Sequence, residues 1–322
     1  MNKLLSSILI CFLMISANYC AADTNPKTTR ILVGFSGGST ERLARILANK
    51  LSEQTGNPVV VDIRLGAAGK IADDIVNKAP GDGSVLGIGS NSNFFIIPAW
   101  DAKKNNREPV WPQIVNTTAI THHLIVANPS LPIQNLRELI RLAKRNPEMI
   151  NIGTNGIGGI KHLILDQICQ LSDTKFNHIP YKTVSGFIFD TVAGRIDGSI
   201  VSYESTITGL LRQKKLKAIA TLYQQRIDSL PNIPTAREQG LNISEPVYWG
   251  ITIPLATTPS VAKIIKDQVN KILSTKEFGN EVVKIGLTPF VQPLEGELNR
   301  LVESDRARWN KIISISNFEL DQ

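Results

Sequence analysis

Residues 31–40 read Ile-Leu-Val-Gly-Phe-Ser-Gly-Gly-Ser-Thr, an apolar strand pattern that ends in a glycine turn. Leu43, Leu47 and Leu51 then recur at helical spacing, so the turn is expected to open an amphipathic helix. Residues 150–159, Ile-Asn-Ile-Gly-Thr-Asn-Gly-Ile-Gly-Gly, repeat this arrangement before a second helical stretch. The start of a helix presents unpaired N–H groups at the positive end of the helix dipole. The two turns therefore predict anion sites, and their distance in the sequence indicates one ligand held from two sides.

Strand and helix patterns alternate from residue 30 to the end of the chain, which favours α/β layers with parallel strands. A second block starts near Leu124, and the chain returns to the first block near Tyr248. We therefore expect a discontinuous domain 1 (residues 23–124 plus 248–322) and an inserted domain 2 (residues 125–247). The strands expected are 59–63 and 85–89, both buried, then 124–127, 176–180, 216–220 and 248–253. The helices expected are 136–144, 187–192 and one that starts at Thr258-Pro259.

Residues 1–22 have the pattern of a cleaved export signal. Lys3 supplies the positive start, residues 4–16 are nearly all apolar, and Ala22 is the expected last residue before cleavage. The apolar run is too short for a membrane span. A lipid anchor on Cys20 is the alternative interpretation. No later segment is long and apolar enough to cross a membrane, so the mature chain is expected to be soluble.

The composition argues against several other classes of protein. The formal charge is +7, or about +6 without Lys3, but basic and acidic residues are interleaved and aromatic residues make up 6%. A nucleic-acid groove needs clustered basic and aromatic residues, so none is expected. Cys169 is the only cysteine after the signal and is expected to be a buried apolar residue without a disulfide. The four histidines show no paired Cys/His spacing, so neither a metal nor a cofactor is expected.

Several segments in order along the mature chain resemble the tripartite tricarboxylate transporter receptors, the Bug (TctC-like) family. They are the first glycine turn with Leu43-Ala44-Arg45, and residues 59–69, 78–83, 128–132, 151–163, 178–182, 230–235 and 308–311. The resemblance implies an α/β, type II periplasmic-binding-protein fold, with two α/β domains and a ligand cleft between them. It also implies a periplasmic receptor: a monomer that captures a small carboxylate and docks transiently on membrane transporter subunits.

The resemblance carries the family's ligand-binding positions onto sixteen residues of this chain. They are Phe35, Ser36, Gly37, Gly38, Ser39, Thr40, Ser90, Asn91, Thr154, Asn155, Gly156, Gly158, His162, Thr183, Val184 and Ser185. Thr183-Val184-Ser185 stands where the family usually has Gly-Ala-Gly. For His162, packing or capping near the helix start is the alternative to ligand contact. Trp249 is interpreted as a hinge or core aromatic.

An acidic position of the family falls on Val201 in this chain. If that residue faces the cleft, no carboxylate is available there for a ligand ammonium, and amino-acid ligands are disfavoured. The leading hypothesis is a receptor that delivers a carboxylate to a membrane transporter. The alternative is an orphan or sensory binding protein that signals carboxylate availability to a membrane partner.

An enzyme is the third possibility, and the sequence argues against it. No Gly-x-Ser-x-Gly elbow accompanies the serines of the turns. His122 and His123 are adjacent on an expected strand, so their side chains point to opposite faces and suit neither a metal pair nor a proton relay. No turnover is expected.

Overall fold

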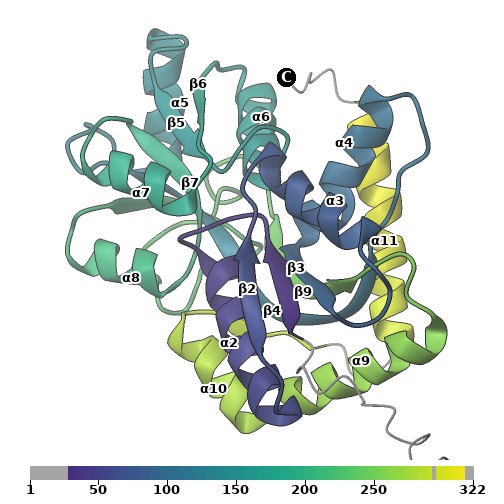
Figure 1. The fold of residues 1–322 in the computed structure, drawn as a ribbon. Coiled ribbons are helices and arrows are strands. Elements are labelled where there is room, and N and C mark those ends of the chain that lie inside the picture. The colour runs from purple at the N-terminus through teal and green to yellow at the C-terminus, as the bar shows by residue number, and fades with distance from the viewer. Residues whose placement is uncertain (1–27, 292–294, 316–322) are drawn as a thin grey trace, which may run out of the picture.

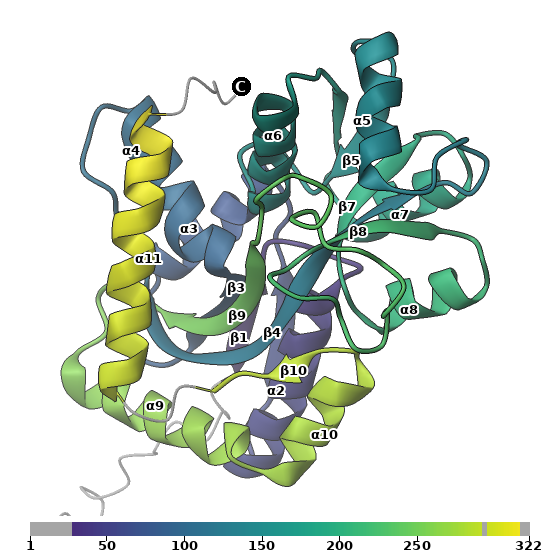
Figure 2. The ribbon, with the colours of Figure 1, turned by 180° about the vertical axis from the view of Figure 1, so that it is seen from behind.

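Two groups of strands meet along one long strand, β4 (Gln113–Ala127) (Figure 1). The structure, a computed structural model, describes residues 28–291 and 295–315. The first part of β4 pairs with β9 (Pro246–Ile253) in one group, and its last residues pair with β7 (Gly198–Ser202) in the other. β4 therefore crosses from one group to the other, as Figure 2 shows from behind.

The first group contains strands in the order β2-β1-β3-β9-β4. Helices α2, α9 and α10 pack on it below and α3 and α4 lie above in the view of Figure 1. The strand bounds are β1 (Thr29–Val33), β2 (Val59–Ile63), β3 (Val85–Ser90) and the short β10 (Thr288–Pro289), which pairs with β4. The helix bounds are α2 (Ser39–Thr55), α3 (Lys70–Lys78), α4 (Ile97–Lys104), α9 (Pro259–Leu273) and α10 (Lys276–Lys284). Two short turns complete this group, a 3₁₀ turn η1 (Ala67–Gly69) and a π-helical turn η2 (Ser92–Ile96).

The second group contains β4, β7, β5 and β6, with β8 on the other side of β4. Its bounds are β5 (Asn151–Thr154), β6 (Asn177–Pro180) and β8 (Lys217–Leu222), with helices α5 (Leu136–Arg145), α6 (Ile160–Ser172), α7 (Val184–Val192) and α8 (Ser205–Arg212). Apolar residues at helical spacing form these helices, and α6 buries most of its first turns. The start of α6 is thereby fixed beside the first group.

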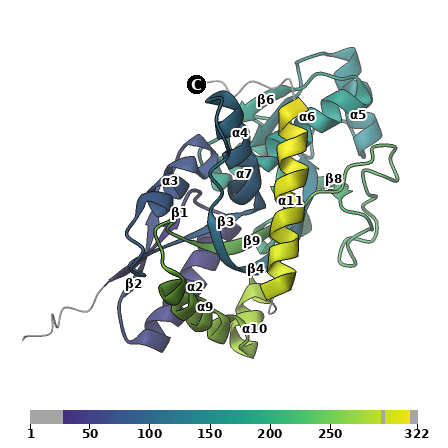
Figure 3. The same cartoon turned by 90° about the vertical axis from the view of Figure 1, so that its right-hand side faces the viewer.

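A hydrophobic core joins the two groups at the back of the molecule. Phe94 and Phe95 of η2 pack in one cluster with Ile164 of α6 and with Trp309. Trp309 lies on α11 (Glu295–Ile315), the long helix that runs along the side of the molecule in Figure 3. Burial of these apolar side chains stabilises the contact between the two groups.

The prediction of parallel strands is correct for the other strands of each group and wrong for the pairs that involve the crossing strands β4 and β9. β1 runs parallel to β2 and β3, and β5 runs parallel to β6 and β7. β9 runs antiparallel to β3 and β4, and β4 runs antiparallel to β7 and β8. The chain crosses outward in β4 and back in β9, and two strands that cross in opposite senses must pair antiparallel.

The predicted helices and strands are otherwise found at the expected places. One expectation of burial is wrong: β2 is an edge strand, and Val60 on it is 45% exposed. Cys169 is half-buried against the shared core rather than fully buried. The expected domain boundaries, after residues 124 and 247, fall inside the crossing strands β4 and β9, and the division into domains stays a prediction.

The expected signal, residues 1–22, and Cys20 lie outside the described residues. Within the described ranges, no helix combines the length and the hydropathy that a membrane span requires.

Candidate ligand-binding site

The first glycine turn joins β1 to α2 and brings the start of that helix to the space between the groups. Gly37 has a left-handed φ of 75°, and Gly38 is the N-cap residue, which offers no side chain to the helix. The Glu41 carboxylate accepts a hydrogen bond from the Gly37 N–H at 2.9 Å. Ser39 and Thr40 then begin the helix, with their hydroxyls at its positive end.

The second glycine turn joins β5 to α6 and faces the first. Gly156 and Gly158 have left-handed φ values of 89° and 76°, and Gly159 is the N-cap residue of α6. Ile160 donates the first N–H of the helix to the Ser92 hydroxyl of the other group at 3.2 Å. The two helix starts therefore point into one space from opposite sides.

The two groups touch directly at the glycine turns. The Val184 N–H donates to the Ser36 carbonyl at 3.1 Å. A Cβ on Gly37 would lie 2.5 Å from the Ser185 hydroxyl and 3.2 Å from the Ser185 backbone nitrogen. Only glycine allows this approach, so the contact between the two turns depends on Gly37.

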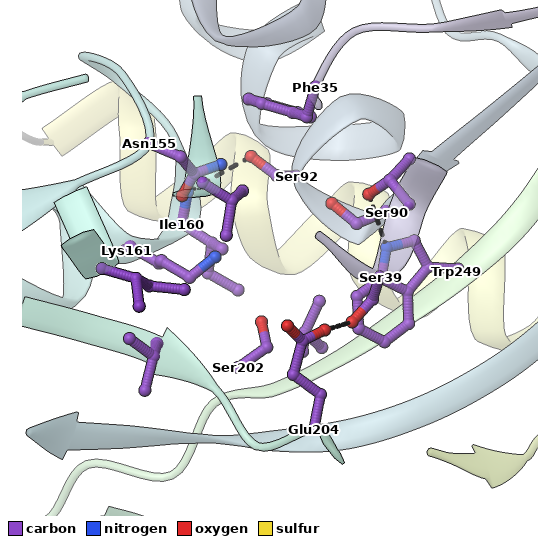
Figure 4. Close-up of a pocket in the computed structure, with 15 residues that line it drawn as sticks. Phe35, Ser39, Ser90, Ser92, Asn155, Ile160, Lys161, Ser202, Glu204 and Trp249 are labelled. Carbon is purple, nitrogen blue, oxygen red and sulfur yellow. Dashed lines mark hydrogen bonds between the residues drawn. The ribbon is translucent and has the colours of Figure 1, made fainter. Parts of the chain in front are cut away.

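A small cavity lies between the turns (Figure 4). Its volume is about 30 Å³, whereas about 10–15 Å³ on this measure holds one water, so the closed space has little room to spare. Its lining comes from both groups: Phe35, Ser39, Thr40, Ser90, Ser92, Asn155, Ile160, Lys161, Val184, Ile188, Val201, Ser202, Glu204, Val247 and Trp249.

Lys161, the second residue of α6, places a cation in this cavity. Lys161 is 7% exposed, and Figure 4 shows its amine pointing into the central space. No residue of the described part forms a hydrogen bond or an ion pair with that amine. Burial lowers the pKa of Lys161 to about 8, and the negative charge of Glu204 partly offsets this effect. The amine is therefore mostly protonated at neutral pH and, with two helix starts, makes the cavity favourable for an anion.

Glu204, just before α8, links the two groups and also faces the cavity. One carboxylate oxygen, Oε2, accepts from the Ser39 hydroxyl and forms an ion pair with Arg42 Nη2 at 2.5 Å. Arg42 Nη1 in turn donates to the Ser205 hydroxyl at 3.1 Å. The other oxygen, Oε1, is buried and has no hydrogen-bond partner among the described residues. Glu204 therefore leaves one acceptor unused beside Lys161.

Six of the sixteen residues predicted to bind ligand line the cavity: Phe35, Ser39, Thr40, Ser90, Asn155 and Val184. The other ten are not in the lining of this cavity: Ser36, Gly37, Gly38, Asn91, Thr154, Gly156, Gly158, His162, Thr183 and Ser185. Gly156 lines a second, larger cavity. Thr183 caps α7 by accepting from the Gly186 N–H at 3.1 Å, and Asn91 Nδ2 donates to the Pro246 carbonyl at 3.1 Å. Contact of any of the sixteen with a ligand stays a prediction.

His162 packs behind the second turn instead of lining the cavity. Its Nδ1 accepts from the Gly158 N–H at 3.1 Å, and its ring stacks on that of His178 with centroids 3.8 Å apart. Burial, together with the His178 ring, lowers the pKa of His162 to about 3. His178 in turn bonds the Thr154 hydroxyl at 2.7 Å, so this pair holds the turn in place.

The position where the family has an acidic residue carries no carboxylate in this chain, but the cavity contains a carboxylate from another position. Val201 does line the cavity, as the sequence suggested, but Glu204 supplies a carboxylate from three residues further along. The strand ends at Ser202, so the chain turns back toward the cavity before α8 begins. A ligand ammonium group can therefore find a carboxylate in this cavity.

Four polar residues of the cavity lining were not predicted from the sequence: Ser92, Lys161, Ser202 and Glu204. Lys161 could have been predicted from its position, because a lysine in the first turn of a helix adds positive charge to the positive end of the helix dipole. Such a placement is unfavourable for the helix alone and indicates a negatively charged partner. Trp249 is a core aromatic, as expected, and it also forms part of the cavity wall, where its Nε1 donates to the Thr40 hydroxyl at 2.9 Å.

A larger cavity of about 650 Å³ adjoins the small one. Phe35 and Asn155 line both, and the outer wall includes Lys70 and Lys182 from opposite groups. No group of three or more His, Cys, Asp or Glu residues within the described ranges is arranged to hold a metal ion.

Residues 43–318 match the tripartite tricarboxylate transporter family receptor. The chain belongs to this family. It is 30% identical over 282 residues to the UPF0065 protein in the tcbD-tcbE intergenic region of Pseudomonas sp. strain P51, covering 86% of this chain and 82% of that protein. Members of the family are solute-binding receptors, so the chain is a binding protein and not an enzyme.

Solved structures agree with the fold. A periplasmic transporter superposes with a TM-score of 0.81 at 26% identity, covering 91% of this chain and 98% of the other. Rpa4515 of R. palustris, solved with adipate, gives a TM-score of 0.78 at 25% identity over 89% of this chain and 96% of the other. MatC of Rhodopseudomonas palustris, solved with malate, superposes with a TM-score of 0.79 at 22% identity, covering 89% of this chain and 98% of the other, which is a likeness in fold. The type II periplasmic-binding-protein fold expected from the sequence is thus confirmed.

Proposed function

We propose that this chain is a periplasmic receptor that captures a small carboxylate by closure of its two groups of strands. The observation that carries the proposal is the buried, unpaired Lys161 amine in a cavity between the starts of α2 and α6. A carboxylate there accepts hydrogen bonds from a lysine and from helix N–H groups, which are charge-assisted and therefore strong. The acids named for the solved relatives, malate and adipate, support this class of ligand.

Closure follows from the position of the ligand. An anion held by both helix starts makes more contacts when the groups are together, so binding shifts the population toward the closed state. The small size of the closed cavity favours a short acid. The contacts between Ser36 and Val184 and between Ser39 and Glu204 add to the closed state across the same gap.

The partner we propose is the membrane part of a tripartite tricarboxylate-type transporter, to which the closed receptor delivers its ligand as a monomer. The family description supports this partner. The expected signal at residues 1–22 supports export to the periplasm, where such a receptor works. Deleting the gene should abolish uptake of the ligand. Intact uptake with lost induction of a carboxylate-responsive gene would instead favour a sensory receptor.

Thermal unfolding with a panel of mono-, di- and tricarboxylates tests the ligand class. A ligand present at a hundred times its Kd stabilises a binding protein by about 2.7 kcal/mol. We expect at least one small acid to raise Tm at neutral pH. A protein freed of ligand by unfolding and refolding that no acid stabilises would refute the proposal.

A further inference from the structure

Three polar atoms at the cavity lack a partner among the described residues. They are Lys161 Nζ, Glu204 Oε1 and Asn155 Oδ1. Glu204 is 2% exposed and Lys161 is 7% exposed, so both charges are largely withdrawn from water. A buried polar atom without a hydrogen bond is unfavourable, and a buried charge more so. The cavity is therefore complementary to a ligand that supplies one negative group and at least one hydrogen-bond donor.

The size of the cavity fixes how close these two features must be on the ligand. Lys161 and Glu204 line the same space of about 30 Å³. A ligand group that occupies this space can therefore reach both side chains. Figure 4 shows the Lys161 amine, the Ser202 hydroxyl and the Glu204 carboxylate directed into that common space.

The two carboxylate oxygens of Glu204 have different surroundings. Oε2 is engaged by Ser39 and Arg42 of the first group, which holds the groups together. Oε1 takes no part in that contact and remains available as an acceptor. A role in closure alone would use Oε2 and leave a buried carboxylate oxygen without a bond, whereas a ligand donor satisfies it.

From this arrangement, and resting on the proposed function, we infer that the receptor selects acids with a hydrogen-bond donor next to the carboxylate. The ligand carboxylate binds Lys161 and the helix starts, and the donor, the hydroxyl of a 2-hydroxy acid or the ammonium of a 2-amino acid, binds Glu204 Oε1. Asn155 Oδ1 accepts a second hydrogen bond from the same donor or a neighbouring one. Lys161 and Glu204 are the specificity-determining residues.

Isothermal titration calorimetry of matched acids tests this selection. The series are propionate, lactate and alanine, and succinate, malate and aspartate, which differ within each series only in the donor; adipate serves as an acid without one. Hydrogen bonds to a charged group have net values that correspond to roughly tenfold or more in affinity. In the series that binds, we expect the hydroxy or amino acid to bind at least about tenfold more tightly than the acid without a donor.

The Glu204→Gln variant distinguishes two roles of Glu204, binding of the ligand's donor and stabilisation of the closed state. Loss of closure lowers affinity for every acid alike, whereas loss of the acceptor charge lowers the preference for the donor-bearing acid. We expect that preference to fall to within about threefold for an ammonium, and to fall less for a hydroxyl, which the amide oxygen still accepts. Lys215→Gln, which changes an exposed lysine that lines neither cavity, should leave all affinities unchanged.

The results of these titrations distinguish a failure of donor selection from a failure of the proposed receptor function. If acids bind but the one without a donor binds as tightly as its partners, or if adipate alone binds, donor selection is wrong and the receptor function stands. An unchanged preference in Glu204→Gln also overturns the role of Glu204. If no acid binds at all, the proposed function itself fails.

Discussion

Lys161 is the residue on which affinity for an acid should depend most. Replacing it with Gln keeps a polar side chain of similar length and removes the charge, so we expect affinity to fall by about tenfold or more. The measurement is calorimetry with the tightest-binding acid at pH 7. Lys215→Gln, on an exposed surface, is the matched control.

The same lysine predicts how affinity changes with pH. Its pKa is about 8 without ligand, and a bound carboxylate raises that pKa because it favours the charged form. Affinity should therefore be constant from pH 6 to 7 and fall above pH 8, by up to about tenfold per pH unit. Lys161→Gln should show a flat profile, and parallel profiles for the two proteins would contradict the assignment.

We expect His123 to contribute to the loss of folding stability at acidic pH. It is fully buried on β4, and burial, with the nearby Lys161 charge, lowers its pKa to about 3. The unfolded chain binds a proton on this residue below about pH 6.5 and the folded chain does not, so the residue lowers the free energy of unfolding as pH falls from 6.5 toward 3.

The variant His123→Gln retains a donor for the Glu245 carbonyl, which His123 Nδ1 contacts at 2.8 Å. Between pH 6 and 4, its unfolding free energy should depend on pH less steeply than that of the wild type, by about 1.4 kcal/mol per pH unit. Urea unfolding at several pH values gives this difference, and the buried Asp73, whose raised pKa acts in the opposite sense, is common to both proteins. Equal slopes would show that His123 is protonated in the folded state.

At the residue scale, sequence located the turns but not the charges. Gly37 and Gly156 were predictable because left-handed turns before a helix favour glycine. Glu204 was not, because its place in the cavity depends on how the chain turns after β7 and on Ser39 and Arg42 from the other group. A contact between residues 165 positions apart has no local pattern to reveal it.

At the scale of elements, the first glycine turn should control closure. Gly37→Ala adds a methyl group at the point where the turn meets Ser185, while Gly56→Ala adds one after α2 where no atom lies within 4 Å. Both positions have left-handed φ values, 75° and 71°, so both variants should lose about 1 kcal/mol of stability from backbone strain.

Only Gly37→Ala should also lose affinity, because it prevents the turns from meeting. We expect about tenfold or more weaker binding of the acid for Gly37→Ala and wild-type binding for Gly56→Ala. Equal binding by the two variants would mean that the contact between the turns is not needed for binding.

The elements themselves were largely predictable, and their pairing was not. Apolar spacing marked α2 and α5, since burial of one face sets a local period, and a short apolar run marked β3, which is buried throughout. The directions of β4 and β9 depend on crossing between the two groups, which leaves no trace in a local period. The position of β2 in the sheet was mispredicted for the same reason: its apolar sequence is typical of a central strand, but the strand order places it at the edge.

At the scale of the whole molecule, binding should make the protein more compact. The shared core joins the two groups, so we expect the cleft to open by bending at β4 and β9 rather than by separation of the groups. Small-angle scattering of the ligand-free protein should give a larger radius of gyration than the protein saturated with acid. The difference should disappear in Gly37→Ala, and a wild-type radius that does not change with ligand would contradict closure.

A crystal structure of the protein with its tightest-binding acid tests the central claim most directly. We predict the acid in the cavity between the starts of α2 and α6, with a carboxylate oxygen within hydrogen-bond distance of Lys161 Nζ and a donor facing Glu204 Oε1. An acid bound elsewhere, or one in the cavity whose carboxylate makes no contact with Lys161, would contradict it.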